Sequence, residues 1–352
     1  MCTVRHTFAA LCLLVLTLSA TAVGVRTFSQ PITLAGKSCH VEGVVIDLRD
    51  PKTSLKVGLA WGHVGRTESL AGIAARYGAV AAINGSFFDA YTKDAIKNPD
   101  MSLISGGQLI FKSGLGSLLG FDADNTPHLG IVRHRLQGTY RSAYGTTQDW
   151  FAYWLNRKPT AATSITLFDR QWGDVVEPWG GTSVVVEQDT VTAVSRQTVS
   201  IPAQGYVLHF RGEAAQLAHF TVGRKLRWSP QRTVEGGDDA AWTRVQEAIG
   251  AGPRVLVHGT PVFNPLAEGF SDPKILQQSG MRSAAGYTAD GKLYLITTCI
   301  ARVSDLGRIL KSFGCVEGIN LDGGASSGLW YRGRYLTKPG RAISNALLVL
   351  EK

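Results

Sequence analysis

Two stretches far apart in this chain carry the same apolar pattern, and each ends in the same polar residue. The matching positions are Leu70, Ile73, Tyr77, Gly78, Val80, Ile83 and Asn84 in the first stretch, and Leu306, Ile309, Phe313, Gly314, Val316, Ile319 and Asn320 in the second. Each spacing predicts an amphipathic helix, a glycine that closes it and a buried strand. Any helix-to-strand unit needs such spacing, so the paired asparagines are the informative part. They predict that both units place equivalent loops at one shared crevice.

The remaining pattern places mostly short strands around these two units. Thr67 is the expected N-cap of the first helix, and 40 glycines favour a sheet-rich protein with many tight connections. Other expected elements are strands at 44–48, 55–60, 255–258, 292–298, 318–321 and 346–350, short alternating runs over 103–230, and helices at 242–249 and 305–313. We expect one α/β domain over residues 23–352 (mixed α+β), with mixed sheets and the two helix-strand units around the crevice.

Residues 1–22 have the features of a secretory signal peptide. Arg5 precedes an apolar stretch from residue 8 to 18, and Ala20-Thr21-Ala22 fits a cleavage site. The stretch is shorter than the 20 or so residues that a membrane span needs, although an uncleaved anchor is the alternative. We therefore expect a secreted or periplasmic protein without a membrane span after signal removal.

The charge of the chain favours anionic partners. The net charge of +9 falls to +8 without residues 1–22, because Arg5 is the charged residue lost. The basic residues are scattered rather than gathered on one helix, so an anionic glycan or sugar-phosphate substrate is expected and nucleic acid is not.

Three cysteines, Cys39, Cys299 and Cys315, remain after residue 22. A bridge between Cys299 and Cys315 is the obvious pairing, but the strand-helix-strand segment between them argues against it. Three free thiols are an equal alternative.

The first candidate site follows the predicted strand 79–83. Asn84 and Asp89 surround Gly85 and two phenylalanines, and an amide beside aromatic rings suits sugar hydroxyls and the apolar side of a sugar ring. An ordinary Asn-Gly turn above a core is the alternative interpretation.

The second candidate site is Asn320-Leu321-Asp322-Gly323-Gly324-Ala325-Ser326-Ser327-Gly328. Asn320 and Asp322 lie two residues apart at a strand end, so both can point to one side. Gly323 and Gly324 let a ligand approach the backbone, while Ser326 and Ser327 could bind an oxyanion. A carboxylate at the end of an apolar strand is costly, which weakens the alternative of a simple turn.

Arg282 and Arg341, each among small residues, are candidates for a bidentate grip on phosphate. Asp122 to Asn125 is interpreted as a hairpin turn rather than a calcium loop. The histidines show no metal-ligand spacing, so no cofactor is expected, and the sequence leaves open whether a divalent metal is bound.

Several of these motifs, in this order, resemble the phosphodiester glycosidases related to the lysosomal uncovering enzyme. The segments that carry the resemblance are A-I-N-G-S-F-F-D at 82–89, A-G-P-R-V-L-V at 251–257, R-S-A-A-G-Y-T-A-D-G-K-L at 282–293, N-L-D-G-G-A-S-S at 320–327 and P-G-R-A-I-S-N-A-L at 339–347, which adds Asn345 to the candidate binding residues. The resemblance spans roughly residues 40–352. It implies hydrolysis of the glycosidic C1–O bond of a sugar-1-phosphodiester with an N-acetylhexosamine-like sugar.

For that reaction Asp322 is the candidate nucleophile or base, with Asp89 as its partner, and the two arginines are the candidates for stabilising phosphate charge. Asn84 and Asn320 are expected to orient the sugar. Two alternatives are a carbohydrate-binding or envelope-assembly protein without turnover, and a glycosidase acting on glycans without phosphate.

Overall fold

The computed structural model describes residues 24–352 except positions 35, 143 and 238. The structure is mostly β, with 50% of the described residues in strands and 12% in helices. The expectation of an α/β fold is therefore wrong. The described helices are short: η1 (Ala60–Gly62), α1 (Leu70–Arg76), α2 (Ala214–Leu217), α3 (Asp239–Trp242), η2 (Pro265–Glu268), α4 (Pro273–Leu276), α5 (Val303–Ser312) and η3 (Gly324–Ser326).

Two sheets build most of the main lobe. The first has the strand order β1 (Val25–Leu34), β2 (Lys37–Asp47), β22 (Lys292–Ala301), β21 (Gly280–Thr288), β23 (Cys315–Asn320), β19 (Arg254–Val257) and β20 (Thr260–Pro261). The second has the order β25 (Arg334–Thr337), β24 (Leu329–Tyr331), β4 (Ala81–Asn84), β26 (Asn345–Glu351) and β3 (Thr53–Leu59). The two helix-strand units of the sequence thus end in different sheets, β4 in the second and β23 in the first.

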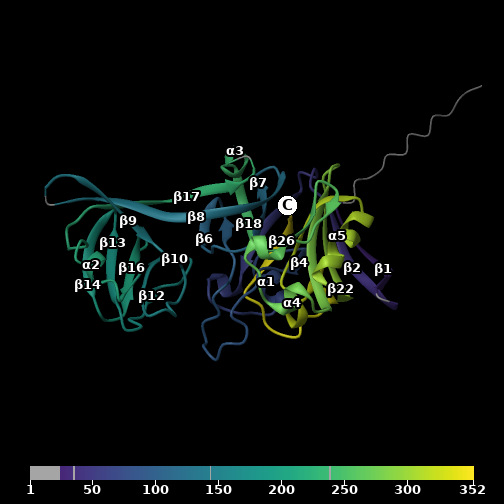
Figure 1. Cartoon of the computed structure of the whole chain (residues 1–352), viewed down its shortest axis with the longest axis horizontal. Coiled ribbons are helices and arrows are strands. Elements are labelled where there is room, and N and C mark those ends of the chain that lie inside the picture. Colours follow the sequence, from purple (N-terminus) through teal and green to yellow (C-terminus); the bar gives the residue numbers. More distant parts are fainter. Residues whose placement is uncertain (1–23, 35, 143, 238) are drawn as a thin grey trace, which may run out of the picture.

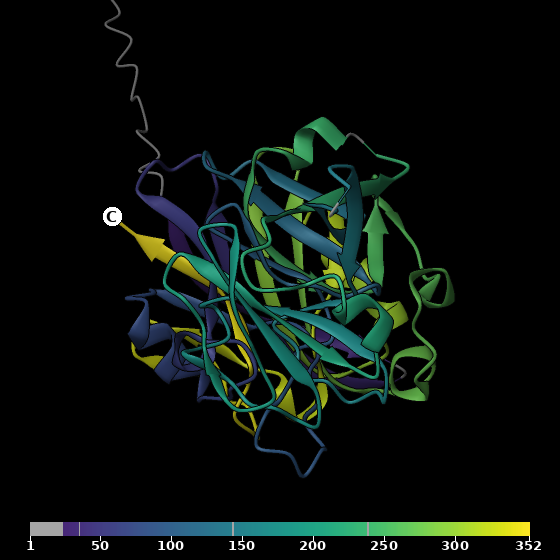
Figure 2. The ribbon, with the colours of Figure 1, turned by 90° about the vertical axis from the view of Figure 1, so that its left-hand side faces the viewer.

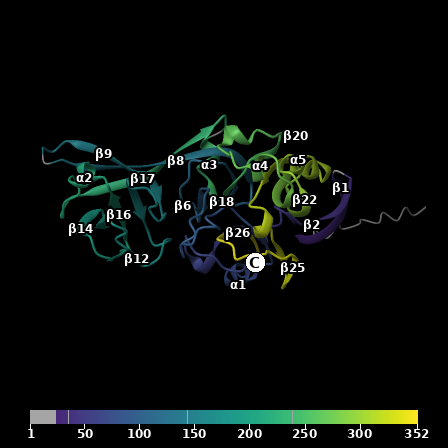
Figure 3. The same cartoon turned by 60° about the horizontal axis from the view of Figure 1, so that its bottom comes forward.

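A third sheet connects the main lobe to a second lobe. Its order is β17 (Leu226–Glu235), β8 (Pro127–Arg141), β7 (Ser117–Asp122), β18 (Val245–Ala251), β5 (Leu103–Ser105) and β6 (Gln108–Phe111), and β9 (Thr147–Ala152) pairs with the far end of β8. The second lobe adds a sheet of β10 (Trp154–Leu155), β11 (Ser164–Phe168), β16 (Gly205–Arg211), β13 (Thr182–Glu187) and β14 (Thr190–Ser195), and a pair of β12 (Val175–Val176) and β15 (Val199–Ser200). The long ribbon of β8 and β17 runs between the lobes (Figures 1 and 3).

The main core lies where the first three sheets face one another. Its buried side chains include Val44, Leu295 and Ile319 from the first sheet, Val57, Ile83 and Leu347 from the second, and Leu119, Phe121 and Ile249 from the third. The helices cover outer faces instead. Ile73 of α1 packs against Leu348 of the second sheet, and Leu306 of α5 packs in the cluster that contains Leu256 of the first. The core is therefore made mainly by sheets, which is why two good helix signals did not give an α/β fold.

Of the predicted helix positions, the structure confirms one and contradicts two. Residues 242–249 were expected to be helical, but β18 begins at Val245 and pairs with β7 and β5. Because its buried apolar residues fill the space between two sheets, tertiary pairing overrides the helical pattern. The N-cap of α1 is Ser69, whose hydroxyl accepts from the Gly72 amide at 3.0 Å, and not Thr67. The helix expected at 305–313 is confirmed as α5.

The cysteine arrangement differs from both expectations. A disulfide joins Cys39 on β2 to Cys299 on β22, and Cys315 is a buried free thiol. The bridge spans adjacent antiparallel strands of the first sheet. Cys39 and Cys299 are 260 residues apart in the sequence, so closeness in sequence, which suggested Cys315 as the partner of Cys299, did not predict this bridge.

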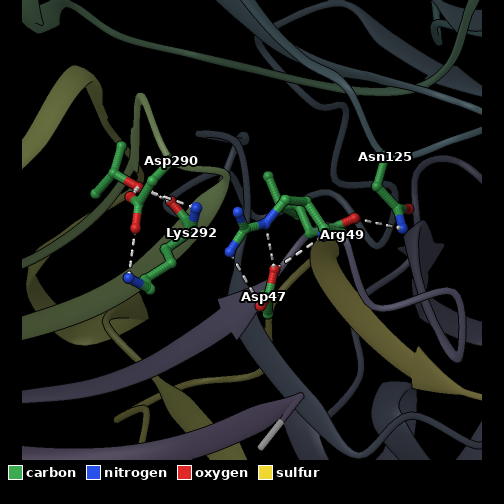
Figure 4. Close-up of polar contacts among 7 residues, drawn as sticks. Asp47, Arg49, Asn125, Asp290 and Lys292 are labelled. Atoms are coloured by element: carbon green, nitrogen blue, oxygen red, sulfur yellow. Dashed lines mark hydrogen bonds and ion pairs between the residues drawn. The ribbon is translucent and has the colours of Figure 1, made fainter. Parts of the chain in front are cut away.

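Figure 4 shows tight turns at one end of the first and third sheets. The Asp47 carboxylate accepts from the Arg49 amide at 3.0 Å and from its Nε at 3.2 Å. Asn125 Nδ2 donates to the Leu48 and Thr53 carbonyls at 3.3 and 2.8 Å. The predicted hairpin turn joins β7 to β8, with the Asn125 backbone at a φ of 65°.

Among the described residues, no helix is long and apolar enough to cross a membrane. The expected signal peptide at 1–22 lies outside the described residues. The expectation of a single domain over 23–352 stays a prediction.

A buried carboxylate, Glu247, joins three strands near the core. It accepts from Lys56 Nζ and the Val57 amide on β3, both at 2.8 Å, and from the Gly106 amide after β5 at 2.9 Å. Glu247 itself lies on β18. This side chain therefore holds the second sheet against the third.

Glu247→Ala should lower the free energy of unfolding by about 2–4 kcal/mol, because two amides and one ammonium lose a buried partner. Urea unfolding followed by fluorescence measures this loss. Glu235→Ala is the control, since Glu235 forms an exposed ion pair with Arg133 at 3.3 Å and should cost less than about 0.5 kcal/mol. Equal losses in the two variants would contradict the assigned role.

Candidate active site

The ends of β4 and β23 meet through main-chain and side-chain hydrogen bonds. Asn84 Nδ2 donates to the Asp322 carbonyl at 2.6 Å, and the Asp322 amide donates to the Gly85 carbonyl at 3.0 Å. Asn84 Oδ1 accepts from Ser283 Oγ at 2.7 Å and from the Gly328 amide at 3.0 Å. The two helix-strand units are thus brought together as the sequence predicted, with the buried Asn84 amide as the connection.

A pocket of about 540 Å³ lies beside this junction. Its wall comes from the segments after β4, before β5, around α4 and along β21, from the loop after β23, and from Arg341 before β26. Phe87 and Phe88 contribute apolar surface, while Asp100, Lys274 and Asp322 contribute charge. The volume and the mixed lining suit a small polar ligand with one apolar side.

Asp322 is a carboxyl group of this pocket with a strongly shifted pKa. Desolvation raises its pKa to about 7, against hydrogen bonds from Ser326 and the Gly323 amide and the charge of Arg341, while Asp100 raises it further. The Gly323 amide donates to Asp322 Oδ1 at 2.8 Å. Near neutral pH this group can therefore exist in either protonation state, as a residue that exchanges a proton requires.

Asp100 is a second carboxyl of the pocket that sequence reasoning missed. Desolvation and the charge of Asp89 raise its pKa to about 6, and Arg157 opposes the shift. It lies 222 positions before Asp322 in a segment without an apolar period or a glycine motif. Its sequence surroundings, Asn-Pro-Asp-Met, read as a turn, so no signal set it apart.

Arg282 reaches the pocket from β21 and is 6% exposed. Its Nη2 donates to the Lys274 and Gln278 carbonyls, and its Nε donates to the Ala301 carbonyl at 3.2 Å. Burial lowers the pKa of this guanidinium, and the Asp322 charge opposes the shift. Among the described residues Nη1 has no hydrogen-bond partner.

A side chain at Gly323 would lie 3.2 Å from the Arg282 Nη1 atom. The glycine therefore keeps the space between the arginine and the Asp322 loop open. The sequence motif predicted only that Gly323 lets a ligand approach the backbone, and this contact gives the steric reason.

Two further cations of the pocket, Arg341 and Lys274, lie against the ring of the exposed Tyr91. Arg341 Nη2 donates to the Tyr91 hydroxyl at 3.1 Å, and its guanidinium lies 4.7 Å from the centre of the Tyr91 ring. Lys274 Nζ lies 4.5 Å from the same ring centre. The hydrogen bond and charge of Arg341 lower the pKa of Tyr91. Tyr91 and Lys274 were not predicted, since an exposed tyrosine and lysine carry no sequence signal.

Half of the predicted site residues line the pocket and half do not. The lining ones are Asp322, Arg282, Arg341, Gly323, Gly324 and Ser326, and the others are Asp89, Asn84, Gly85, Asn320, Ser327 and Asn345.

The residues outside the lining have other contacts. Asn320 Nδ2 donates to the Gly252 carbonyl at 2.7 Å, and Asn345 Oδ1 accepts from the Ser86 amide at 2.9 Å. Asp89 accepts from Asn98 Nδ2 at 3.2 Å and lies close enough to Asp100 to raise its pKa. These contacts favour positioning of the pocket walls over contact with a ligand.

Within the described part of the chain, no group of three or more His, Cys, Asp and Glu side chains is arranged to hold a metal ion. The expectation that no cofactor is needed stays a prediction. Whether a divalent metal binds stays open, as it was from the sequence.

Comparison with protein families gives a match over residues 180–350, to the family described as phosphodiester glycosidase. This range contains Arg282, Asp322 and Arg341. No curated protein sequence matches the chain.

Solved structures share the fold at low sequence identity. A hypothetical protein from Synechocystis has a TM-score of 0.80 and 24% identity, with 94% of this chain and 62% of that chain covered. A putative exported protein from Burkholderia pseudomallei has a TM-score of 0.74 and 21% identity, with 89% and 74% covered.

The zebrafish N-acetylglucosamine-1-phosphodiester alpha-N-acetylglucosaminidase catalytic domain, auto-inhibited by its pro-peptide, has a TM-score of 0.53 and 14% identity, with 95% of this chain and 85% of that chain covered. The present chain spans less than two thirds of the length of the Synechocystis protein. At these identities the likeness shows the fold, and the family match supports a glycosidase-type function. Residues 180–350, just under half of this chain, are therefore similar to the phosphodiester glycosidase family.

Proposed function

We propose that this protein is an exported hydrolase that cleaves the C1–O bond of a sugar-1-phosphodiester with an N-acetylglucosamine-like sugar. The observation that carries the proposal is one pocket in which Asp322, with a pKa raised to about 7, lies among Arg282, Arg341 and Lys274. A carboxylate suits the cationic sugar carbon of the transition state, and cations suit the departing phosphate.

The leaving group sets what the protein must supply. Cleavage of C1–O expels a phosphate monoester, whose second pKa is about 6. Such a group carries its own negative charge near neutral pH, so protonation by an acid matters less than for an ordinary glycoside. Stabilisation of phosphate charge and a carboxylate at C1 are the main requirements.

Roles for the pocket residues follow from their contacts. Asp322 acts at C1, as nucleophile or as the base for water. The partner-free Nη1 of Arg282 binds a phosphate oxygen inside the pocket, and Arg341 with Lys274 binds the phosphate at the mouth. Ser326 and the Gly323 amide hold the Asp322 carboxylate in place.

Asp100 tunes Asp322 in this proposal. The two carboxyl groups titrate as neighbours, since the charge of Asp100 raises the pKa of Asp322. Asp89 acts one step further away, through the pKa of Asp100. In this proposal Asp100 is the direct partner of Asp322, a role that the sequence suggested for Asp89.

Asn84 holds the Asp322 loop rather than the sugar. Its amide is occupied by the Asp322 carbonyl, the Ser283 hydroxyl and the Gly328 amide. Asn320 helps to hold the end of β23 in place, because its Nδ2 donates to the Gly252 carbonyl.

The decisive experiment is turnover of an N-acetylglucosamine-1-phosphodiester by the purified protein in ¹⁸O-labelled water. Label in the sugar product supports C1–O cleavage, and label in the phosphate product overturns it. Retention of the glycan without turnover would favour the carbohydrate-binding alternative, and equal turnover of a neutral glycoside would favour the ordinary glycosidase. Unchanged rates in EDTA are expected if no divalent metal takes part.

Asp322→Asn should lower kcat about 10³-fold or more, because the amide cannot act as nucleophile or base at C1. In the unmodified protein kcat/KM should rise with pH through about 7, as Asp322 ionises. Asp100→Asn should shift this limb to lower pH, because one raising charge is removed. A folded Asp322→Asn variant with near-normal kcat would contradict the assignment.

A stability measurement accompanies this variant as its folding control. The folded-state pKa of Asp322 is raised from 3.8 to about 7, so its ionisation between these pH values costs stability. Asp322→Asn should therefore be more stable than the unmodified protein at about pH 8 and should lose this advantage near pH 4.

Arg282→Lys and Arg341→Lys should each lower kcat/KM for the phosphodiester about 10- to 100-fold, because lysine keeps the charge and loses the fork of donors. Turnover of p-nitrophenyl alpha-N-acetylglucosaminide, which has no phosphate, should fall less. Arg334→Lys on the exposed end of β25 is the matched control and should change neither rate. Equal losses on both substrates would argue against phosphate contact.

Asn84→Ala should lower kcat and the free energy of unfolding, the latter by about 2–3 kcal/mol, because a buried carbonyl and amide lose their partner. KM should change little if Asn84 does not contact the sugar. Asn125→Gly, which removes another buried amide far from the pocket, should lose stability and keep kcat. A large rise in KM with normal kcat would restore the sugar-contact interpretation.

A further inference from the structure

One face of the ribbon that leads to the second lobe is exposed along three paired strands. The register places Arg227, Thr139 and Asp149 opposite one another across β17, β8 and β9, and the next such row contains Ser229, Gln137 and Phe151. Successive residues of a strand point to opposite faces, so these rows share one face.

Burial alternates as this arrangement requires. Arg135, Phe151 and Tyr153 are exposed, whereas Leu136 and Trp150, which point the other way, lie in the core of the second lobe. We call the set on this side the outer face: residues 135, 137, 139, 141, 147, 149, 151, 153, 227, 229 and 231, of which 137 and 139 are half-buried and the others exposed. It is a solvent-facing sheet surface on the opposite side from the second-lobe core.

Three adjoining hollows lie along the outer face. The middle one, of about 420 Å³, shares Thr139 and Arg227 with a hollow of about 630 Å³ toward the strand ends near Arg141. It shares Gln137 with a hollow of about 550 Å³ that contains Phe151 and Tyr153. Because neighbouring hollows have residues in common, they adjoin one another across β8, and we call the three together the trough.

The trough is strongly basic. Arg135, Arg141 and Arg227 lie on the outer face, and Lys112, Arg224 and Lys225 line the hollows at its two ends. Asp149 is the carboxylate lining these hollows. Among the described residues, the side chains of Arg135, Arg141 and Asp149 have no hydrogen-bond or ion-pair partner. Arg227 has a loose, exposed pair with Asp189 at 3.8 Å.

Two aromatic rings stand at one end of the trough. Phe151 and Tyr153 are 41% and 40% exposed, and their ring centres lie 5.1 Å apart at 83°. Hydrogen bonding fixes the second ring, since its hydroxyl donates to Glu213 at 3.3 Å. Rings exposed beside amide side chains such as Gln137 can pack against the apolar side of a sugar, while the amides bond its hydroxyls.

We infer that the outer face binds a segment of an anionic polysaccharide. The cations complement carboxylate or phosphate groups on the glycan, the rings contact its sugars, and the length of the trough suits several residues of a chain. Asp149 in the middle of the face accepts sugar hydroxyls but repels a continuous phosphate backbone, which favours a glycan over a nucleic acid.

This site is separate from the candidate active site. Figures 1 and 3 place β9 and the second lobe on the far side of the molecule from α4 and β22, and Figure 2 views that lobe from its own end. The inference does not rest on the proposed function, because it uses none of the pocket residues. A protein with this site could hold a polymer at one lobe while the other lobe acts on it.

The test is affinity electrophoresis of the full chain in gels that contain polygalacturonate, poly(glycerol phosphate), neutral dextran or single-stranded DNA. Retardation is expected with polygalacturonate, a carboxylate polysaccharide, and it should weaken with salt. Dextran should not retard the protein. No retardation by polygalacturonate, or retardation by poly(glycerol phosphate) or DNA alone, would overturn the inference.

Variants separate the face from general charge. Arg135→Gln with Arg227→Gln, and Phe151→Ala with Tyr153→Ala, should each weaken binding roughly tenfold. Arg66→Gln with Arg334→Gln removes the same charge from exposed sites elsewhere and should bind normally, as should Phe151→Tyr with Tyr153→Phe, which keeps both rings. All variants should keep kcat on a small substrate. Normal binding by both face variants would refute the assignment.

Discussion

The hydrogen bonds of one buried amide hold the candidate site together. Asn84 ends a strand of one sheet and binds the main chain on both sides of the Asp322 loop, which follows a strand of another sheet. Its third partner, Ser283, lies on β21 beside Arg282. β21 and β23 pair directly in the first sheet, so the Asn84 junction holds this pair, with its arginine and its carboxyl group, against the end of β4 in the second sheet.

Two charged side chains of the pocket, Asp322 and Arg282, lower the stability of the folded state because they are held away from water. Burying the Asp322 carboxyl raises its pKa to about 7, so its ionised form is costly to the folded state. Burial likewise lowers the pKa of Arg282, although its guanidinium is tied to three carbonyls. Such opposing charges held in a partly dry pocket are typical of sites whose chemistry needs them. The rigid sheets around the pocket offset this cost through their large shared core.

Sequence reasoning failed on fold class for an identifiable reason. The helix predicted from the stripe at 70–77 and the helix predicted at 305–313 both form, as α1 and α5, but both lie on the outside of sheets and do not separate parallel strands. Residues 242–249 were predicted to be a helix, but residues 245–251 form the central strand β18, because β7 and β5 pair with it on either side. Glycine content was the better guide, since the many hairpins between antiparallel strands use it in their turns.

The sequence by itself determined that two strand ends carry Asn84 and Asp322, that Gly323 follows, and that Arg282 and Arg341 accompany them, because local period and residue chemistry suffice for this. Only the tertiary structure decided which side chains face the pocket. It added Asp100, Tyr91 and Lys274, turned Asn84 toward the main chain, and joined Cys39 to Cys299. These outcomes depend on contacts between residues far apart in the chain, and such contacts are fixed by how sheets pack, which leaves no mark on local sequence.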